Sequence, residues 1–109
     1  MHPRQERRAK NESLFRDVNE RIEQIATKLE VTDSTEFVCE CDDLACVDRL
    51  EMGLSDYEHV RGDPTTFLVV PGHEDPAVED VVEEHERYNL VRKHPGEPAR
   101  VAAENSPRQ

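Results

Sequence analysis

All three cysteines of this chain lie within eight consecutive positions, and this clustering limits how the surrounding residues can fold. Their spacing is Cys39-x-Cys41-x4-Cys46, and a further soft ligand, His73, follows the Pro71-Gly72 turn after an apolar run. Thiolates and imidazole nitrogens are the usual ligands of structural zinc sites, in which four protein ligands surround the ion. We therefore predict a Zn²⁺ site formed by Cys39, Cys41, Cys46 and His73.

The fourth ligand has alternatives. His59 lies on a predicted short helix soon after the cysteines, and the carboxylates of Asp42 and Asp43 directly follow Cys41. We favour His73, because Pro71-Gly72 gives a tight, exposed turn directly after a buried strand. Three Cys and one His would fill every position around the ion, which is typical of a structural rather than a catalytic site.

The composition explains why a metal would be useful to this chain. Its 109 residues are 35% hydrophobic and 36% charged and include no tryptophan. We expect a single small domain over residues 1–94, and a core of this size is a weak source of stability that a bound metal often supplements. The odd number of cysteines favours reduced thiols. Neither a signal-peptide pattern nor a long apolar run is found, so we expect a cytoplasmic protein without a membrane span.

The chain is strongly acidic, with 25 Asp and Glu against 14 Lys and Arg and a formal net charge of −11. Such a chain is repelled by phosphate backbones and anionic membrane surfaces, so nucleic acid and membranes are not expected partners. Basic residues concentrate in residues 1–10, which form a candidate flexible basic arm. Residues 95–109 are rich in Pro, Gly, Ala, Glu and Ser, which predicts a disordered tail.

A long amphipathic helix is predicted over residues 4–30. Its apolar side chains recur at intervals of three and four residues and so form one face, made by Leu14, Val18, Ile22, Ile25 and Leu29. This stripe can pack on the domain's own sheet, which we favour, or contact a protein partner or a second copy of the chain.

The middle of the chain predicts short strands. Residues 36–41 and 47–52 alternate as strands. The four-residue connection 42–45 and then Cys46 lie between them, which predicts a hairpin with the cysteines at its tip. A short helix over residues 56–61 and a buried strand over residues 67–70 follow, whereas residues 78–93 fit either a helix and a strand or a hairpin. Together these elements predict an α+β fold, in which the long N-terminal helix packs on a small, mostly antiparallel sheet with a cysteine-bearing hairpin.

These motifs resemble those of an uncharacterised family of small actinobacterial proteins. The shared pattern comprises Phe37-Val-Cys-Glu-Cys41 with Cys46, then the Tyr57 to Arg61 segment, then Phe67 to Glu74 with its Pro-Gly-His-Glu run. The chain departs from the pattern in having Asp56 where the family has Glu. The resemblance spans roughly residues 7–93. It implies the same Cys and His grouping, favours a hairpin over residues 78–93 and implies no activity.

We expect a zinc-stabilised, cytosolic interaction or regulatory module with a protein partner, or a second copy of itself, on the N-terminal helix. The alternative is a thiol- or zinc-dependent enzyme that uses the Cys39, Cys41, Cys46 and His73 cluster with Glu74 as its general base. We favour the non-enzymatic role, because a Glu beside a ligand is expected by chance in so acidic a chain. The sequence also has neither a glycine-rich phosphate loop nor a hydrolase motif.

Overall fold

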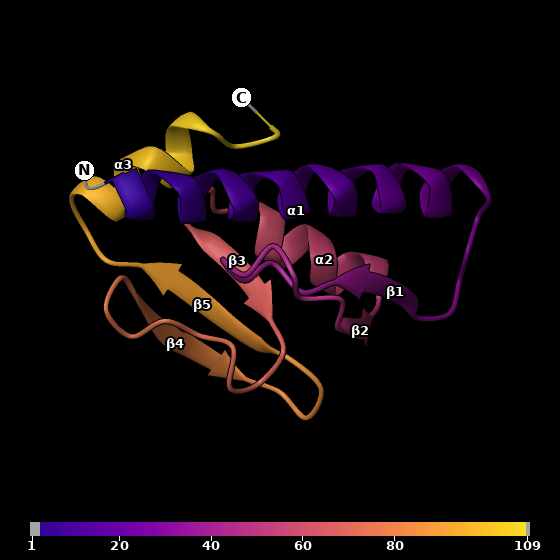
Figure 1. Cartoon of the computed structure of the whole chain (residues 1–109). Helices are drawn as coiled ribbons and strands as arrows, with labels where there is room; N and C mark the ends of the chain where they lie inside the picture. The colour runs from indigo at the N-terminus through magenta and orange to yellow at the C-terminus, as the bar shows by residue number, and fades with distance from the viewer. Residues whose placement is uncertain (1–2, 109) are drawn as a thin grey trace.

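The computed structural model of the chain describes the backbone of residues 3–108 and the side chains of residues 7–108. It has the predicted α+β fold. One long helix lies across both sheets and also over the short helix Leu54–Arg61 (Figure 1). In chain order the elements are α1 (Pro3–Lys28), β1 (Thr35–Val38), β2 (Arg49–Met52), α2 (Leu54–Arg61), β3 (Thr66–Val69), β4 (Glu79–Glu84), β5 (Asn89–Lys93) and α3 (Glu97–Glu104). No helix among the described residues is both long and apolar enough to cross a bilayer.

The strands form two small antiparallel sheets. Strands β1 and β2 pair with Phe37 opposite Leu50, as expected for the predicted hairpin. The second sheet has the order β3-β5-β4. Its strands β4 and β5 form a hairpin, so residues 78–93 are a hairpin rather than a helix and a strand. All four residues of β3 are buried, which confirms the buried strand predicted there. Its bounds, Thr66–Val69, lie one residue before the predicted 67–70.

The core has two parts. In the first, the ring of Phe37 stacks on that of Tyr57 with centroids 4.5 Å apart, and Leu50, Leu68 and Leu90 pack around them. The second part contains side chains of β3, β5 and α3 and also two of the cysteines; its buried members are Cys39, Cys41, Phe67, Val69, Val91 and Ala102. The cysteine cluster is therefore built into the hydrophobic core.

Helix α1 packs on the rest of the domain, but with a different face from the one we favoured. Of the apolar stripe, only Ile22 packs against the core, and Leu14, Val18, Ile25 and Leu29 are exposed. The buried face instead consists mainly of polar side chains, namely Glu12, Arg16 and Asn19 together with Ala26. Two of these side chains bind backbone atoms: Arg16 donates to the carbonyls of Pro64 and Ala102, and Asn19 accepts from the Val38 N–H and donates to the Val38 carbonyl.

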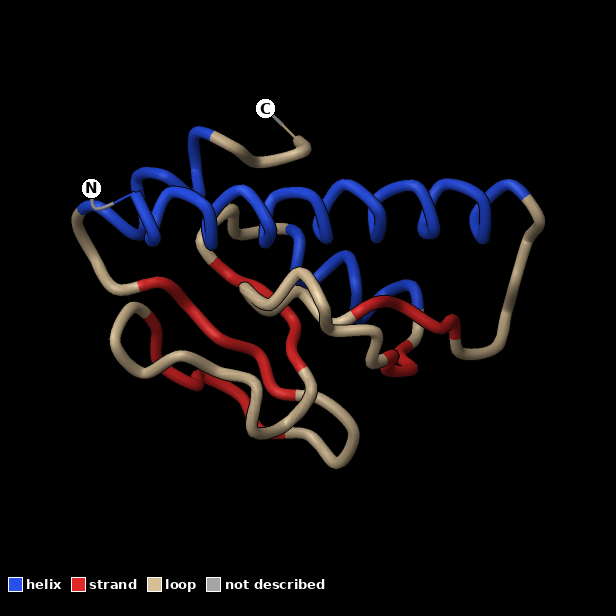
Figure 2. Tube along the Cα trace, in the orientation of Figure 1, coloured by secondary structure: helices blue, strands red, loops and turns tan. Residues whose placement is uncertain are grey.

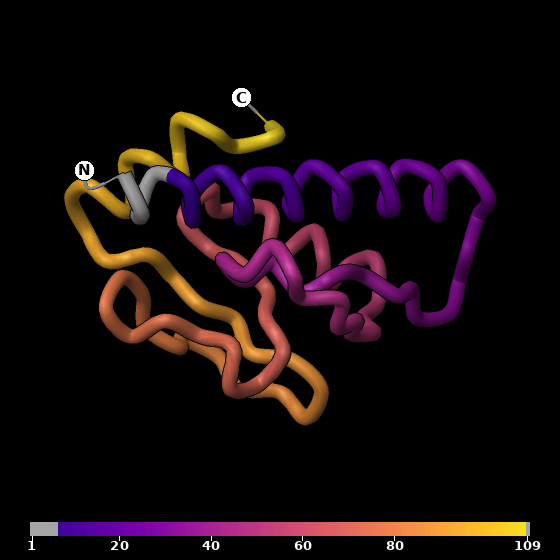
Figure 3. Tube along the Cα trace, viewed as in Figure 1, coloured from indigo at the N-terminus to yellow at the C-terminus, as the bar shows by residue number. Residues whose placement is uncertain are grey.

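The ends of the chain also differ from expectation. The candidate basic arm is helical from Pro3, while residues 1–2 lie outside the described residues. Within the predicted disordered tail, residues 97–104 form α3, which lies alongside the N-terminal part of α1 (Figure 3). Tertiary contacts outweigh the composition here, because Ala102 is buried and its carbonyl accepts a hydrogen bond from Arg16 at 2.9 Å. The expectation of a disordered tail is therefore wrong for this segment.

Candidate metal centre

The three cysteines lie in the loop of residues 39–48 that joins β1 to β2 (Figure 2). The predicted strand ends at Val38, three residues earlier than expected. The reason is a change of partner: the Glu40 N–H donates to the Leu68 carbonyl of β3 at 2.8 Å instead of to β2. The loop thus leaves the hairpin and follows the edge of β3, which places Cys39 and Cys41 in the second part of the core, with Cys46 packed against it.

The structure brings together the four side chains that the sequence singled out. One ligand atom from each of Cys39, Cys41, Cys46 and His73 lies within 4.8 Å of all the others. The Nδ1 atom of His73 is 3.6 Å from the sulfurs of both Cys39 and Cys46. A tetrahedral zinc ion with ordinary bond lengths would separate such atoms by about 3.6 Å. The four side chains could therefore hold a metal ion with little rearrangement.

The turn after β3 places His73. Its N–H donates to the Val70 carbonyl at 2.9 Å, and the preceding Gly72 has a φ of 93°, a conformation that glycine adopts without strain. The other ring nitrogen, Nε2, lies 3.3 Å from the carboxylate of Asp48. A carboxylate on the outer nitrogen fixes the ring orientation and makes the inner nitrogen a better ligand. Nδ1 is thus the ring nitrogen that faces the sulfurs.

The protonation of the thiols is strongly coupled. The pKa of Cys41 is lowered to about 5, chiefly because the Cys39 thiol donates a hydrogen bond to it. The same hydrogen bond, together with burial, raises the pKa of Cys39, and burial raises that of Cys46. A divalent cation would stabilise all three cysteines as thiolates, with release of protons.

A buried ion pair anchors the cysteine loop from behind. Glu40, between two of the cysteines, is fully buried and accepts hydrogen bonds from both terminal nitrogens of Arg61, at 2.7 and 2.9 Å. Asn19 of α1 also donates to its carboxylate, and so does the Leu68 N–H of β3. The Val70 N–H in turn donates to the Cys39 sulfur at 3.2 Å. The loop is therefore fixed by α1, α2 and β3 together.

The rival ligands lie elsewhere or have other partners. His59 is on the exposed face of α2, with Nε2 2.9 Å from Glu83, and does not belong to the cluster. The carboxylate of Asp42 is 3.5 Å from Arg8, and that of Asp43 accepts from the Ala45 N–H. Glu74, the proposed general base of the alternative enzyme, accepts a hydrogen bond from the Gly72 N–H in its own turn.

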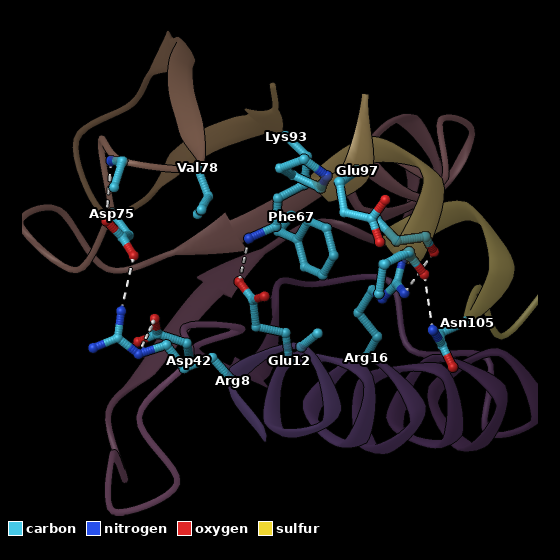
Figure 4. Close-up of a pocket in the computed structure, with 15 residues that line it drawn as sticks. Arg8, Glu12, Arg16, Asp42, Phe67, Asp75, Val78, Lys93, Glu97 and Asn105 are labelled. Atoms are coloured by element: carbon cyan, nitrogen blue, oxygen red, sulfur yellow. Dashed lines mark hydrogen bonds and ion pairs between the residues drawn. The ribbon is translucent and has the colours of Figure 1, made fainter. Parts of the chain in front are cut away.

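Sequence reasoning missed a second buried polar cluster beside a cavity of about 260 Å³ between α1, α3 and the three-stranded sheet (Figure 4). The Lys93 ammonium lies 2.6 Å from Glu12 and 2.7 Å from Glu79. Burial raises the pKa of Glu12 to about 7. The pKa of Lys93 is also raised, because the two carboxylates outweigh the opposite effect of burial.

This cluster rests on an aromatic ring. The guanidinium of Arg16 and the ammonium of Lys93 lie 4.4 and 4.9 Å from the centroid of Phe67. Arg16 also donates hydrogen bonds to the carbonyls of Pro64 and Ala102. A third cation, Arg8, lies at the edge of the cavity, 3.3 Å from Asp75. The cluster therefore ties α1 and α3 to the sheet. The sequence signal was the recurrence of polar residues opposite the apolar stripe of the helix.

Comparison with known proteins was made at three levels. No protein-family model, no curated protein and no solved structure matches the chain. The resemblance to small actinobacterial proteins therefore stays a prediction, and the function is inferred from the site and the surfaces of this chain.

Proposed function

We propose that this chain is a small, zinc-stabilised module of the cytosol that presents a protein-binding surface on α1 and catalyses no reaction. The observation that carries the zinc assignment is the convergence of three sulfurs and one imidazole nitrogen within 4.8 Å. Tetrahedral sites of sulfur and nitrogen ligands select Zn²⁺ over hard cations such as Mg²⁺ and Ca²⁺. Four protein ligands also leave no position for a reactive water.

A stabilising role fits the location of the cluster. The site joins the loop between β1 and β2 to the turn after β3, so an ion would cross-link the two sheets. The cysteines complete a small core, in which a metal ion can supply a large share of the folding free energy. An enzymatic use of the cluster has less support, because Glu74 is bound to its own turn and Cys39 and Cys41 are buried.

Metal analysis of protein purified without added metal tests the assignment. A single zinc ion per chain is expected, with loss of the metal in Cys39→Ser and His73→Ala. The matched control is His59→Ala, which removes an exposed imidazole bound to Glu83 and should keep its zinc. Wild-type protein without metal, or with iron as its main metal, would contradict the zinc site. Full zinc content in His73→Ala would exclude His73 as the fourth ligand.

A further inference from the structure

The outer face of α1 carries a row of exposed apolar side chains. The exposed fractions are 49% for Leu14, 38% for Val18, 59% for Ile25 and 70% for Leu29. Leu29 directly follows the last residue of α1, and its N–H still donates to the Ile25 carbonyl at 3.0 Å. Single exposed aliphatic residues are common on soluble proteins, but an aligned row along one helix marks an interaction surface. Over these residues the row is about 22 Å long at the ordinary helical rise.

The domain cannot turn this row inward. The opposite side of the helix is held by Arg16, which donates to two backbone carbonyls, by Asn19, bound to β1 and Glu40, and by the Glu12 pair with Lys93. Rotating α1 about its axis would leave these buried polar groups unpaired, at a large free-energy cost. The apolar row therefore needs a partner from outside the chain.

The spacing within the row has a symmetry that identifies this partner. Leu14 and Val18 are four residues apart, as are Ile25 and Leu29, and the two pairs are separated by seven positions. The pattern reads the same in both directions, as an antiparallel pair of identical helices requires of a two-fold contact. Both pairs belong to ridges of residues four apart, the ridges that interdigitate in the commonest class of helix packing.

The charges beside the row agree with this symmetry. Asp17 and Lys28 flank it and are exposed, and neither is in an ion pair within the described part of the chain. An antiparallel arrangement brings Asp17 of each helix near Lys28 of the other. Residues 7–28 also hold six basic and four acidic side chains, whereas the whole chain has a net charge of −11. Glu12 and Arg16 among them are buried, so the rest of this segment has five basic and three acidic side chains, and two copies would meet little repulsion across it.

We infer that α1 pairs antiparallel with α1 of a second copy of the chain, with Val18 against the partner's Ile25 and Leu14 against the partner's Leu29. This inference identifies the partner in the proposed function and depends on that proposal only for the assignment of α1 as the interaction surface. One pair of helices makes a small interface, of the class below about 1,200 Å² that is usually transient. The dimer should therefore form and dissociate with protein concentration.

Sedimentation velocity over a wide range of concentrations tests the dimer, with zinc content and far-ultraviolet circular dichroism recorded for each variant. Val18→Glu and Ile25→Lys should each raise the dimer Kd at least about tenfold, because each puts an unpaired charge into an apolar contact. The matched control is Val82→Glu, since Val82 on β4 is 39% exposed and Val18 is 38% exposed. The control should keep the wild-type Kd.

The double variant Val18→Glu/Ile25→Lys tests the arrangement of the helices. In the antiparallel pair each new Glu at position 18 faces a new Lys at position 25 of the other copy. The two opposite charges attract, so the dimer Kd should return to within about tenfold of wild type. Parallel pairing would bring like charges together and keep the double variant monomeric. A monomeric wild type, a double variant weaker than both single variants, or equal weakening in the Val82→Glu control would overturn the inference.

The zinc measurement separates this inference from the proposed metal site. Variants that retain zinc but lose the dimer support the helix contact, whereas a dimer formed by protein without zinc would contradict the metal site and leave the contact standing. A monomeric wild type with full zinc content would refute the helix contact alone.

Discussion

Glu40 and Arg61 form a fully buried two-point ion pair, with both guanidinium terminal nitrogens 2.7 and 2.9 Å from the Glu40 carboxylate oxygens. Glu40 sits between Cys39 and Cys41, so its side chain is held by the domain while the neighbouring sulfurs face His73. Residues 39–41 thus contain two of the candidate metal ligands and the side chain that positions them. Supporting residues of this kind commonly affect metal affinity almost as much as the ligands do.

Removing the Glu40 charge should make the domain less stable against unfolding and weaken its metal binding. Glu40→Gln leaves Arg61 charged and unpaired in the core, so we expect a loss of about 3–5 kcal/mol in the free energy of unfolding. Urea denaturation in excess zinc measures this loss. Glu36→Gln is the control: it removes an exposed carboxylate 3.7 Å from Arg49, and it should cost less than about 1 kcal/mol. Equal effects would contradict a supporting role for Glu40.

Asp48 should tune the metal site through His73. Asp48→Ala removes the carboxylate 3.3 Å from Nε2, and it should lower zinc affinity by about tenfold, the low end of the usual range, because Asp48 is 55% exposed. Competition with a chromogenic chelator measures the affinity. The control is Asp33→Ala, which removes an exposed carboxylate in the loop before β1 and should leave the zinc affinity unchanged. An Asp48→Ala affinity equal to wild type would show that His73 needs no orienting partner.

The aromatic stack should dominate the stability of the first part of the core. Phe37→Ala removes a fully buried ring that stacks on Tyr57 at 4.5 Å, so we expect a loss of about 3–5 kcal/mol. Leu44→Ala, on an exposed loop side chain, should change stability by less than about 0.5 kcal/mol. Thermal unfolding of zinc-loaded protein compares the two variants. A small effect of Phe37→Ala would mean that the zinc site alone holds the hairpin.

Glu12 should make stability fall as the pH rises toward neutrality. Burial raises its pKa from 4.5 to about 7, so in this interval the folded chain keeps a proton that the unfolded chain releases. Its contribution to stability is full below pH 4.5 and is lost as the pH rises through about 7. Glu12→Gln stays neutral and should avoid a loss of up to about 3 kcal/mol.

Urea denaturation of both proteins at several pH values in excess zinc tests this expectation. The difference between wild type and Glu12→Gln cancels the opposite pH dependence of zinc binding to the thiols, which weakens as they are protonated. A difference that does not change with pH would show that folding leaves the pKa of Glu12 unchanged.

Local patterns predicted several features correctly. Cysteine spacing and the Pro-Gly turn selected the four side chains that the structure brings within 4.8 Å of one another. Alternation predicted the β1–β2 hairpin, because side chains on a strand change face at every residue, and the structure pairs its strands with Phe37 opposite Leu50. The extent of β1 was not predictable in this way, since its end is set by the Glu40 hydrogen bond to β3, a strand many residues later in the chain.

The sequence by itself predicted an amphipathic helix over residues 4–30, which the structure has as α1 (Pro3–Lys28), and it showed that the soft metal ligands are few and clustered. Only the tertiary structure decided which face of α1 is buried. The core is already filled by Phe37, Tyr57 and the leucines around them, while carbonyls such as those of Val38, Pro64 and Ala102 still need donors. Long polar side chains on α1 supply those donors, so the apolar row is left facing outward. Periodicity shows that a helix has two faces, but the choice between them depends on groups distant in the sequence.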